Sequence, residues 1–434
     1  MFAMKINTAS AARGEVGLPG DKSISHRAAI LCSLAEGSSE ITNFATSADC
    51  SATVKCLRSL GVQIDRDGGG LSVRGVGKAG LSAPALPLDC ENSGTTMRLM
   101  SGVLAGHDFE STLVGDASLQ KRPMLRVMGP LNKMGAKVTG EDGRAPLHII
   151  GRHPLTALDY EPSAASAQLK SCVLLAGLNA DGETSVFEKT PTRDHTERML
   201  RWLGVNVETK QVESGTRILV NGDSRLFARD IKVPGDISSA AFFLVAAGFL
   251  AGSELSLPNV GVNGSRRAVV SVLQGIGVDI QVSNEREVCN EPVADLKVRG
   301  TADIGGSRPV RLAGAVIANL IDEIPVLAIA GTRLAGGLEI RDAGELRIKE
   351  SDRIAAVAEN LRRMNADVEE LEDGLRIGPS ELSGAVIDSY GDHRIAMAFA
   401  VAGLFAKGET EILGAECAAV SYPDFFNTLA RVIY

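Results

Sequence analysis

LPGDKSISHRAAILCSLAEGS, residues 18–38, is the stretch that decides the fold, because its pattern returns as VPGDISSAAFFLVAAGFLAGS at residues 233–253. The Pro, the Gly, the Asp, one Ser and the closing Gly-Ser stand in the same register in both copies. Each copy predicts a Pro-Gly break, a residue that can cap a helix, and then a buried helix. The copies begin almost half of the 434-residue chain apart, which predicts two related halves.

A shorter pattern recurs within the halves, with LRSLGVQI as its first copy. It is typical of the last turn of a helix, a Gly or Asn in the left-handed conformation, and then a strand that alternates apolar and polar residues. A sixth, incomplete copy ends the chain as LARVIY, and the N-terminal MKINTAS can supply its missing strand. The complete copies begin at Leu57, Leu131, Leu200, Leu273 and Leu361.

These repeats predict units of about 70 residues, three in each half, in which each unit buries its apolar face against its neighbours. An open solenoid is the alternative arrangement. The Pro-Gly breaks at Pro19–Gly20 and Pro234–Gly235 favour two closed three-fold α/β domains instead. We expect one domain over residues 20–235 and a second made of residues 1–19 together with 236–434.

The composition, with 44% hydrophobic and 23% charged residues, is typical of a soluble globular protein. A net charge of −8 argues against nucleic-acid or membrane-surface partners, so an anionic ligand would need a local cluster of Lys and Arg. The longest apolar run, residues 240–251, is too short to span a bilayer, and the N-terminus has no apolar signal core. Seven scattered Cys predict reduced thiols in the cytoplasm, and six dispersed His predict no metal site.

The two copies of the opening stretch differ in their basic residues, which are the ones that could bind an anion. The first copy has Lys22 and Arg27 at positions where the second has Ile237 and Phe242. Helix capping would be needed in both copies, so the extra donors favour an anion site at Lys22, Ser23 and Arg27. Other donor-rich stretches in the first half are residues 92–96, 121–122 and 166–170. For residues 92–96, plain helix capping is an equally good interpretation.

The second half supplies acidic residues next to cations. Asp322 and Glu323 precede an apolar run, where unpaired charge would be costly. Lys349 and Arg353 stand four apart, which predicts one helix face with Glu350 beside them. Taken alone, this spacing is more often a surface salt-bridge ladder. A third polar group, residues 392–394, begins another apolar helix.

Assembled in order, the motifs cover essentially the whole chain: LPGDKSISHRA, NSGTTMRLMSG, GDASLQKRPM, SAQLKS, RDHTERML, DEIPVLA, LRIKESDRI, GDHRIAMAFA and SYPDFF. The chain resembles the 5-enolpyruvylshikimate-3-phosphate (EPSP) synthase family of enolpyruvyl transferases. The resemblance implies two domains, each of three βαβαββ units in an inside-out α/β barrel, with the active site in the cleft between them. It also implies a place in chorismate and aromatic amino-acid biosynthesis, and a target of glyphosate.

The resemblance further implies transfer of the enolpyruvyl group of phosphoenolpyruvate to the 5-hydroxyl of shikimate 3-phosphate, with no metal or cofactor, by a cytoplasmic monomer. Asp322 would take the hydroxyl proton, Glu350 would move the proton at the methylene carbon, and Lys22 would assist the departing phosphate. The first domain would mainly bind shikimate 3-phosphate, and the second would carry the catalytic acids and the Arg residues for phosphoenolpyruvate. The implied shikimate 3-phosphate residues are Lys22, Ser23, Arg27, Ser166, Ala167, Gln168, Arg193, Asp322 and Lys349. Those implied for phosphoenolpyruvate are Lys22, Gly94, Arg122, Gln168, Arg353 and Arg394.

The chain departs from the family pattern at Ala167 and Arg193, where other members have Ser, and at Val420, where many have Lys. These features resemble the family's second class, which is often less sensitive to glyphosate. Gly94 instead resembles sensitive members, because larger residues replace it in tolerant ones. The alternative enzyme is the related UDP-N-acetylglucosamine enolpyruvyl transferase. That enzyme needs Lys-Asn in place of Lys22–Ser23 and usually a reactive Cys near residues 115–122. A noncatalytic phosphometabolite-binding protein would not need Asp322 and Glu350 together.

Overall fold

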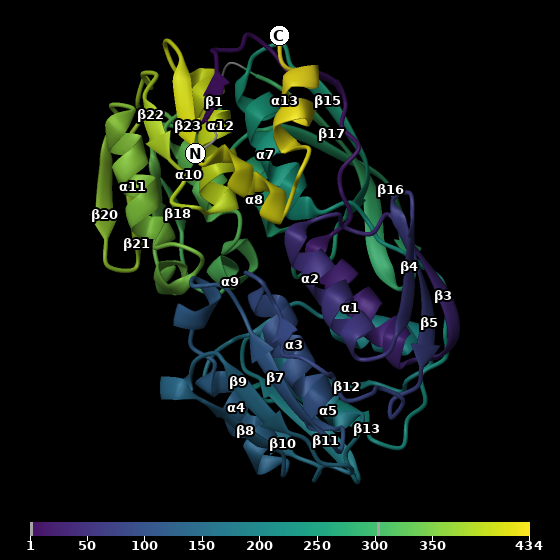
Figure 1. The fold of residues 1–434 in the computed structure, drawn as a ribbon. Helices are drawn as coiled ribbons and strands as arrows, with labels where there is room; N and C mark the ends of the chain where they lie inside the picture. Colours follow the sequence, from purple (N-terminus) through teal and green to yellow (C-terminus); the bar gives the residue numbers. More distant parts are fainter. Residues whose placement is uncertain (1–2, 302–303) are drawn as a thin grey trace. The chain divides into compact units, whose positions relative to one another are not determined.

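The computed structural model describes residues 3–301 and 304–434, and the chain divides into two compact units. We call Gly20–Val233 with Val288–Glu291 the first-half unit. We call Met1–Pro19, Pro234–Glu287 and Pro292–Tyr434 the second-half unit. The chain thus passes from one unit to the other at the two Pro-Gly breaks and again on either side of Val288–Glu291. Figure 1 shows the helices and strands of both units.

The first-half unit has three four-stranded sheets among its described residues, with strand orders β14-β3-β5-β4, β6-β7-β9-β8 and β10-β11-β13-β12. Its helices are α1 (Lys22–Leu34), α2 (Ala48–Ser59), α3 (Gly94–Ala105), α4 (Leu125–Lys133), α5 (Ala167–Gly177) and α6 (His195–Trp202). Its strands are β3 (Glu36–Thr42), β4 (Gln63–Asp67), β5 (Gly70–Val76), β6 (Leu88–Asp89), β7 (Glu110–Val114), β8 (Lys137–Gly140), β9 (Leu147–Ile150), β10 (Asp159–Tyr160), β11 (Glu183–Glu188), β12 (Glu208–Val212), β13 (Gly215–Asn221) and β14 (Ile231–Lys232).

The second-half unit also has three sheets among its described residues, with strand orders β1-β23-β22, β16-β17-β15-β2 and β18-β19-β21-β20. Its helices are α7 (Ile237–Phe249), α8 (Ala268–Gly275), α9 (Val316–Leu320), α10 (Ile324–Gly331), α11 (Arg353–Arg363), α12 (His393–Phe405) and α13 (Phe425–Val432). Its strands are β1 (Ala3–Ile6), β2 (Arg13–Glu15), β15 (Glu254–Gly261), β16 (Asp279–Val288), β17 (Glu291–Arg299), β18 (Val310–Leu312), β19 (Leu338–Ile340), β20 (Val368–Leu371), β21 (Gly374–Ile377), β22 (Val386–Asp388) and β23 (Thr410–Leu413).

One repeating unit describes the five four-stranded sheets, and the three-stranded sheet β1-β23-β22 is an incomplete copy of it. In the order β6, α3, β7, α4, β8, β9, a short strand lies parallel to the first long strand, and a hairpin then adds two antiparallel strands. The turn from the second helix into the hairpin has positive φ in every complete copy, at Gly61, Gly135, Gly204, Gly277 and Asn365. The mixed α/β class and the three repeats per half are therefore confirmed, and so is the left-handed residue at the end of each repeat's helix.

Three repeats are assembled from distant parts of the chain. β14 lies parallel to β3 and so completes the sheet that follows α1, although about 190 residues separate the two strands. β2 lies parallel to β15 and completes the sheet that follows α7 in the same way. β1 pairs antiparallel with β23, with Ala3 opposite Leu413. The prediction that the N-terminus supplies the strand missing from the sixth repeat is confirmed.

Each unit has its own hydrophobic core built around apolar helices. Every residue of α7 is buried, and α1 is buried from Ile24 to its end. A helix that is buried on all sides must be apolar all round, so its polar groups gather at its ends. The donor-rich helix starts are therefore the candidate places for binding and catalysis. Within residues 3–301 and 304–434, no helix combines the length and the apolar character needed to cross a membrane.

Candidate active site

The start of α1 carries the first group of predicted site residues. Asp21 caps the helix, because its carboxylate accepts a hydrogen bond from the backbone N–H of Ile24 at 2.9 Å. Asp236 caps α7 in the same way, with the N–H of Ser238 at 3.0 Å. Both copies of the duplicated stretch therefore keep the cap. The basic residues of the first copy do something else, since Lys22 Nζ forms an ion pair with Asp49 Oδ2 at 2.9 Å.

Arg27 is buried and its guanidinium is held from three directions. Nε donates to Thr196 Oγ1 and Nη2 donates to Ser171 Oγ, each at 2.7 Å, while Nη1 donates to the carbonyl of Ser23 at 2.9 Å. Burial lowers the pKa of Arg27 to about 10, which leaves it charged at neutral pH, and the positive charge of Arg193 acts in the same direction. The predicted anion site at Lys22, Ser23 and Arg27 thus has a fixed cation.

Two guanidinium groups meet at Gly94, the first residue of α3. A Cβ at this position would lie 3.0 Å from Nη1 of Arg98 and 3.2 Å from Nη1 of Arg122. Ser93 caps the helix by accepting from the N–H of Thr96 at 3.1 Å. A helix N-terminus and two guanidinium groups together favour an anion, and the absence of a side chain at Gly94 lets both guanidinium groups approach the helix start.

Gln168 connects this group to α5. Its Oε1 accepts from Arg98 Nη1 at 2.7 Å, and its Nε2 donates to Thr95 Oγ1 at 2.9 Å. Ser166 caps α5 through the N–H of Leu169 at 3.3 Å, and Ala167 is the first residue of the helix. These three predicted residues therefore lie together at one helix start.

In the second-half unit, Arg353 lies at the centre of three carboxylates. Its side chain is 1% exposed, with Nε 2.8 Å from Asp392 Oδ2 and Nη2 2.6 Å from Glu350 Oε2. Nη1 lies 3.5 Å from Asp322 Oδ1. Burial alone would lower the pKa of Arg353, but the carboxylates of Asp392, Glu350 and Asp322 raise it above its usual value. Arg353 thus brings the two predicted catalytic acids to one guanidinium.

Arg394 holds Asp322 from the other side. Its Nη1 donates to the backbone carbonyl of Asp322 at 2.9 Å, and its Nη2 lies 3.7 Å from Asp322 Oδ2. Asp392 caps α12 through the N–H of Arg394 at 2.9 Å, besides pairing with Arg353. The carboxyl group of Asp322 remains partly accessible, with 15% of its side chain exposed. A bound molecule could therefore reach this carboxyl group.

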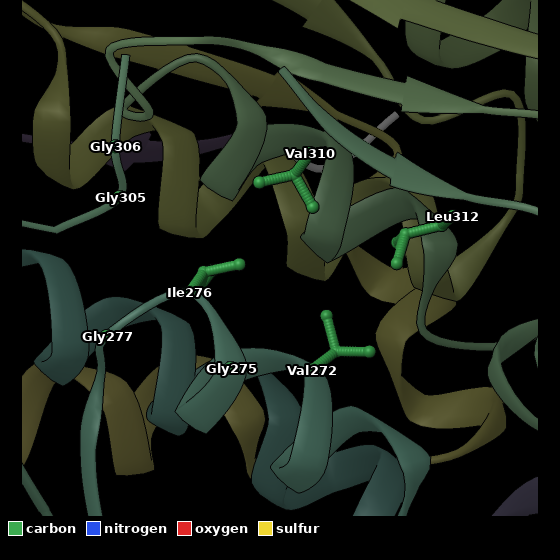
Figure 2. Close-up of a pocket in the computed structure, with 8 residues that line it drawn as sticks. All are labelled: Val272, Gly275, Ile276, Gly277, Gly305, Gly306, Val310 and Leu312. Atoms are coloured by element: carbon green, nitrogen blue, oxygen red, sulfur yellow. The ribbon is translucent and has the colours of Figure 1, made fainter. Parts of the chain in front are cut away.

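A separate cavity in the second-half unit has a different character (Figure 2). Its volume is about 510 Å³, and Figure 2 shows the side chains of Val272, Ile276, Val310 and Leu312 around it. Glycines form the rest of the lining, and none of the predicted site residues is among the lining residues. An apolar lining offers no charge to a phosphate, so this cavity is not the candidate site.

Comparison with known proteins places these residues in context. The model of the family described as EPSP synthase (3-phosphoshikimate 1-carboxyvinyltransferase) matches residues 6–429. The chain belongs to this family. The 3-phosphoshikimate 1-carboxyvinyltransferase of Salinibacter ruber is 51% identical over 433 residues, 98% of each chain. That of Pelotomaculum thermopropionicum is 53% identical over 425 residues, 97% of this chain and 96% of the relative. A solved EPSP synthase from Acinetobacter baumannii, 42% identical, matches with a TM-score of 0.88 over 99% of this chain and 98% of that one.

The match to the EPSP synthase family confirms the prediction of a transferase enzyme that acts on small molecules. The alternative, UDP-N-acetylglucosamine enolpyruvyl transferase, is not favoured. Relatives about 50% identical over nearly the whole chain are named 3-phosphoshikimate 1-carboxyvinyltransferase. The residue assignments implied by the family remain predictions.

One local prediction about the family motif LRIKESDRI is wrong. Lys349 and Arg353 do not share a helix face, because the preceding 3₁₀ turn ends at Ile348 and α11 begins only at Arg353. Asp352 is the cap of α11, and its carboxylate accepts from the N–H of Ala355 at 3.1 Å. Lys349 therefore lies in an extended segment before the helix.

Asp322 and Glu323 also separate. Glu323, 1% exposed, turns away from Arg353 and accepts a hydrogen bond from Ser238 Oγ. Arg266 Nη2 lies 3.9 Å from Glu323 and donates to Ser238 Oγ at 2.5 Å. Sequence reasoning did not find Arg266, because nothing in its neighbourhood marks it as the partner of a residue so far along the chain.

Other members of the site were also missed. Asp49 lies inside α2, whose pattern gives no indication of its partner Lys22. Arg98, Ser171 and Thr196 stand inside the motifs NSGTTMRLMSG, SAQLKS and RDHTERML, and those motifs were the signal that could have assigned them. Asp392 was expected in a polar group at a helix start, but its pair with Arg353 was not. Among the described residues, no group of three or more His, Cys, Asp or Glu is placed to hold a metal ion.

Proposed function

We propose that this chain transfers the enolpyruvyl group of phosphoenolpyruvate to the 5-hydroxyl of shikimate 3-phosphate, which gives 5-enolpyruvylshikimate 3-phosphate and phosphate. The observation that carries the proposal is the meeting of Asp322 and Glu350 on the guanidinium of Arg353. A protein that only bound a phosphorylated metabolite would not need two acids at a buried cation. The full-length family match supports the same reaction.

Shikimate 3-phosphate would be bound mainly by the first-half unit. The phosphate and hydroxyl groups need fixed cations and small donors, and Arg27 with the start of α5 offers both. Asp322 and Lys349 of the second-half unit would complete this set. The proposed residues are Lys22, Ser23, Arg27, Ser166, Ala167, Gln168, Arg193, Asp322 and Lys349.

Phosphoenolpyruvate would bind at the guanidinium groups. Arg122 lies beside Gly94 at the start of α3, and Arg98 of that helix is hydrogen-bonded to Gln168. An anion with both a phosphate and a carboxylate needs several cations in a protein of net charge −8. The proposed residues are Lys22, Gly94, Arg122, Gln168, Arg353 and Arg394.

The chemistry would proceed by addition and then elimination. Asp322 accepts the proton of the 5-hydroxyl as the hydroxyl oxygen bonds to C2 of phosphoenolpyruvate, the carbon that bears the phosphate oxygen, and Glu350 protonates the methylene carbon. In the second step the bond from that carbon to the phosphate oxygen breaks, and Glu350 takes a proton back from the methyl group. Lys22 stabilises the departing phosphate. No step in this proposal uses a metal or a cofactor.

The test is release of inorganic phosphate from phosphoenolpyruvate in the presence of shikimate 3-phosphate, with UDP-N-acetylglucosamine as the alternative acceptor. We expect release only with shikimate 3-phosphate. Release with UDP-N-acetylglucosamine would assign the chain to the other enolpyruvyl transferase, and binding without release would assign it to a noncatalytic role. We further propose a cytoplasmic monomer, which sedimentation and cell fractionation would test.

A further inference from the structure

Lys170 is a buried ammonium group that the proposed reaction does not use. It lies on α5 with its side chain 1% exposed, 2.9 Å from Glu188 Oε2 and 2.7 Å from Glu197 Oε1. Burial alone would lower the pKa of Lys170, but Glu197 and Glu188 raise it above its usual value, so the amine is charged. Taking three charges out of water costs several kcal/mol for each ion, which raises the question of what the cluster does.

The first connection runs from Lys170 to Arg27. Lys170 and Ser171 are neighbours on α5, and Thr196 and Glu197 are neighbours on α6. Lys170 pairs with Glu197, and Ser171 Oγ lies 2.7 Å from Thr196 Oγ1, so two adjacent contacts join the helices. These same two hydroxyls accept the Nη2 and Nε hydrogen bonds of Arg27. The ion pair thereby fixes the two acceptors that orient the guanidinium.

The second connection runs from Lys170 to the segment that carries Arg193. Glu188, at the end of β11, accepts a hydrogen bond from the hydroxyl of Thr192 and a longer one, at 3.5 Å, from its backbone N–H. Lys170 Nζ donates to the carbonyl of Thr192, also at 3.5 Å. Thr192 directly precedes Arg193. The hydroxyl, the backbone N–H and the carbonyl of Thr192 thus all contact the Lys170–Glu188 pair.

The positive charge of Lys170 also offsets the negative charge of Glu197 near Arg27. Glu197 Oε2 is buried and accepts no hydrogen bond from the described residues. The ion pair between Glu197 Oε1 and Lys170 therefore provides most of the compensation for burying the charge of Glu197. The negative charge of Glu197 already acts on Arg27, because it raises the pKa of that guanidinium against the effect of burial. Without the ammonium, Glu197 would compete with a substrate phosphate for Arg27.

We propose that Lys170 is a positioning residue for shikimate 3-phosphate. It holds Arg27 and Arg193 in their binding positions and neutralises the carboxylates that would otherwise compete for them. This inference rests on the proposed function, because it takes Arg27 and Arg193 as contacts of shikimate 3-phosphate.

The main test is Lys170→Met, which keeps the length of the side chain and removes its charge. We expect the Kd of shikimate 3-phosphate, measured by calorimetry at a temperature where circular dichroism shows the variant folded, to rise about tenfold or more. The KM of phosphoenolpyruvate should change less than threefold, since its proposed cations do not contact Lys170. A merely structural role would not produce this split between the substrates.

Lys78→Met is the matched control, because Lys78 also supports α5 from its other end. Its Nζ donates to the carbonyls of Leu178 at 2.9 Å and Gly222 at 2.6 Å. We expect this variant to bind shikimate 3-phosphate as the unaltered protein does. Adding Glu197→Gln to Lys170→Met should restore part of the lost affinity, because the competing charge is then gone.

Binding of shikimate 3-phosphate to Lys170→Met within threefold of the unaltered protein would overturn the inference, and so would an equal loss in Lys78→Met. Should Lys170→Met fail to fold, Thr192→Val decides, because it removes the hydroxyl contact with Glu188 and leaves the buried charges paired. Weakening of shikimate 3-phosphate by threefold or more in Thr192→Val supports the inference, and unchanged binding overturns it. Failure of the unaltered protein to bind shikimate 3-phosphate would instead refute the proposed function.

Discussion

Gly94→Ala tests whether phosphoenolpyruvate binds at Gly94 and Arg122. The added Cβ would lie 3.0 Å from Arg98 Nη1 and 3.2 Å from Arg122 Nη1, whereas ordinary van der Waals contact begins at 3.4 Å. Each guanidinium must therefore recede by a few tenths of an ångström. Both contacts are with the ends of flexible side chains, so the backbone does not have to move.

The expected magnitudes follow from this geometry. Folding should not suffer, since Ala in a helix is more stable than Gly by ~0.5–1 kcal/mol. A hydrogen bond to a charged group contributes about 1.5–3 kcal/mol. Partial loss of one such bond from Arg122 corresponds to roughly a tenfold rise in the KM of phosphoenolpyruvate. The Kd of shikimate 3-phosphate should stay within about twofold, because Gly94 is not among its proposed contacts.

The assay is initial-rate kinetics with phosphoenolpyruvate varied, together with calorimetric titration of shikimate 3-phosphate. Gly129→Ala is the control, since Gly129 also lies in a helix, α4, and has no atom within 4 Å of an added Cβ. We expect that variant to keep both constants. An unchanged KM for phosphoenolpyruvate in Gly94→Ala would refute the placement of this substrate at Gly94 and Arg122.

Three further substitutions test the charged residues. Glu350→Gln should keep substrate binding and lose turnover by roughly two orders of magnitude or more, as for a lost general acid–base group; near-normal turnover would remove Glu350 from the mechanism. Lys22→Ala should weaken both substrates in calorimetry, and unchanged affinity would leave Lys22 only its pair with Asp49. Burial alone would raise the pKa of Asp392, but Arg353 holds it below its usual value, so this stabilisation is present above about pH 4 and is lost as the pH falls through the lowered pKa. Asp392→Asn, which keeps a capping side chain, should therefore be less stable at pH 7 and lose less stability between pH 7 and pH 3 in urea unfolding.

The sequence predicted those features that depend on neighbouring residues. A Gly or Asn after the last turn of a helix marks a left-handed residue wherever it stands, and Gly61 and Asn365 both adopt that conformation. The duplicated Pro-Gly-Asp likewise marked two helix starts, each with its Asp as the cap. Local steric and hydrogen-bonding rules were sufficient for the repeats.

The partners of the charged groups could not be predicted in this way. Arg353 pairs with Asp392, and Lys22 with Asp49, across sequence separations that no periodic pattern encodes. The helix face expected for Lys349 and Arg353 was wrong because spacing alone does not reveal that Asp352 interrupts the segment as a cap. Contacts of this kind depend on how whole repeats pack, and the family motifs mark the residues without stating which atoms meet.

The exchange of short strands between distant repeats affects how the chain folds as it is synthesised. β2 leaves the ribosome early, but its partner β15 is made more than 200 residues later, and the partner of β1, β23, follows only at Thr410–Leu413. At about 5–20 residues per second, β1 waits roughly 20–80 s. The first-half unit consists of the continuous segment Gly20–Val233 and the short segment Val288–Glu291. Most of its core can therefore form during that time. The nascent N-terminus meanwhile has unpaired strand edges, which are the segments most exposed to aggregation or to chaperones.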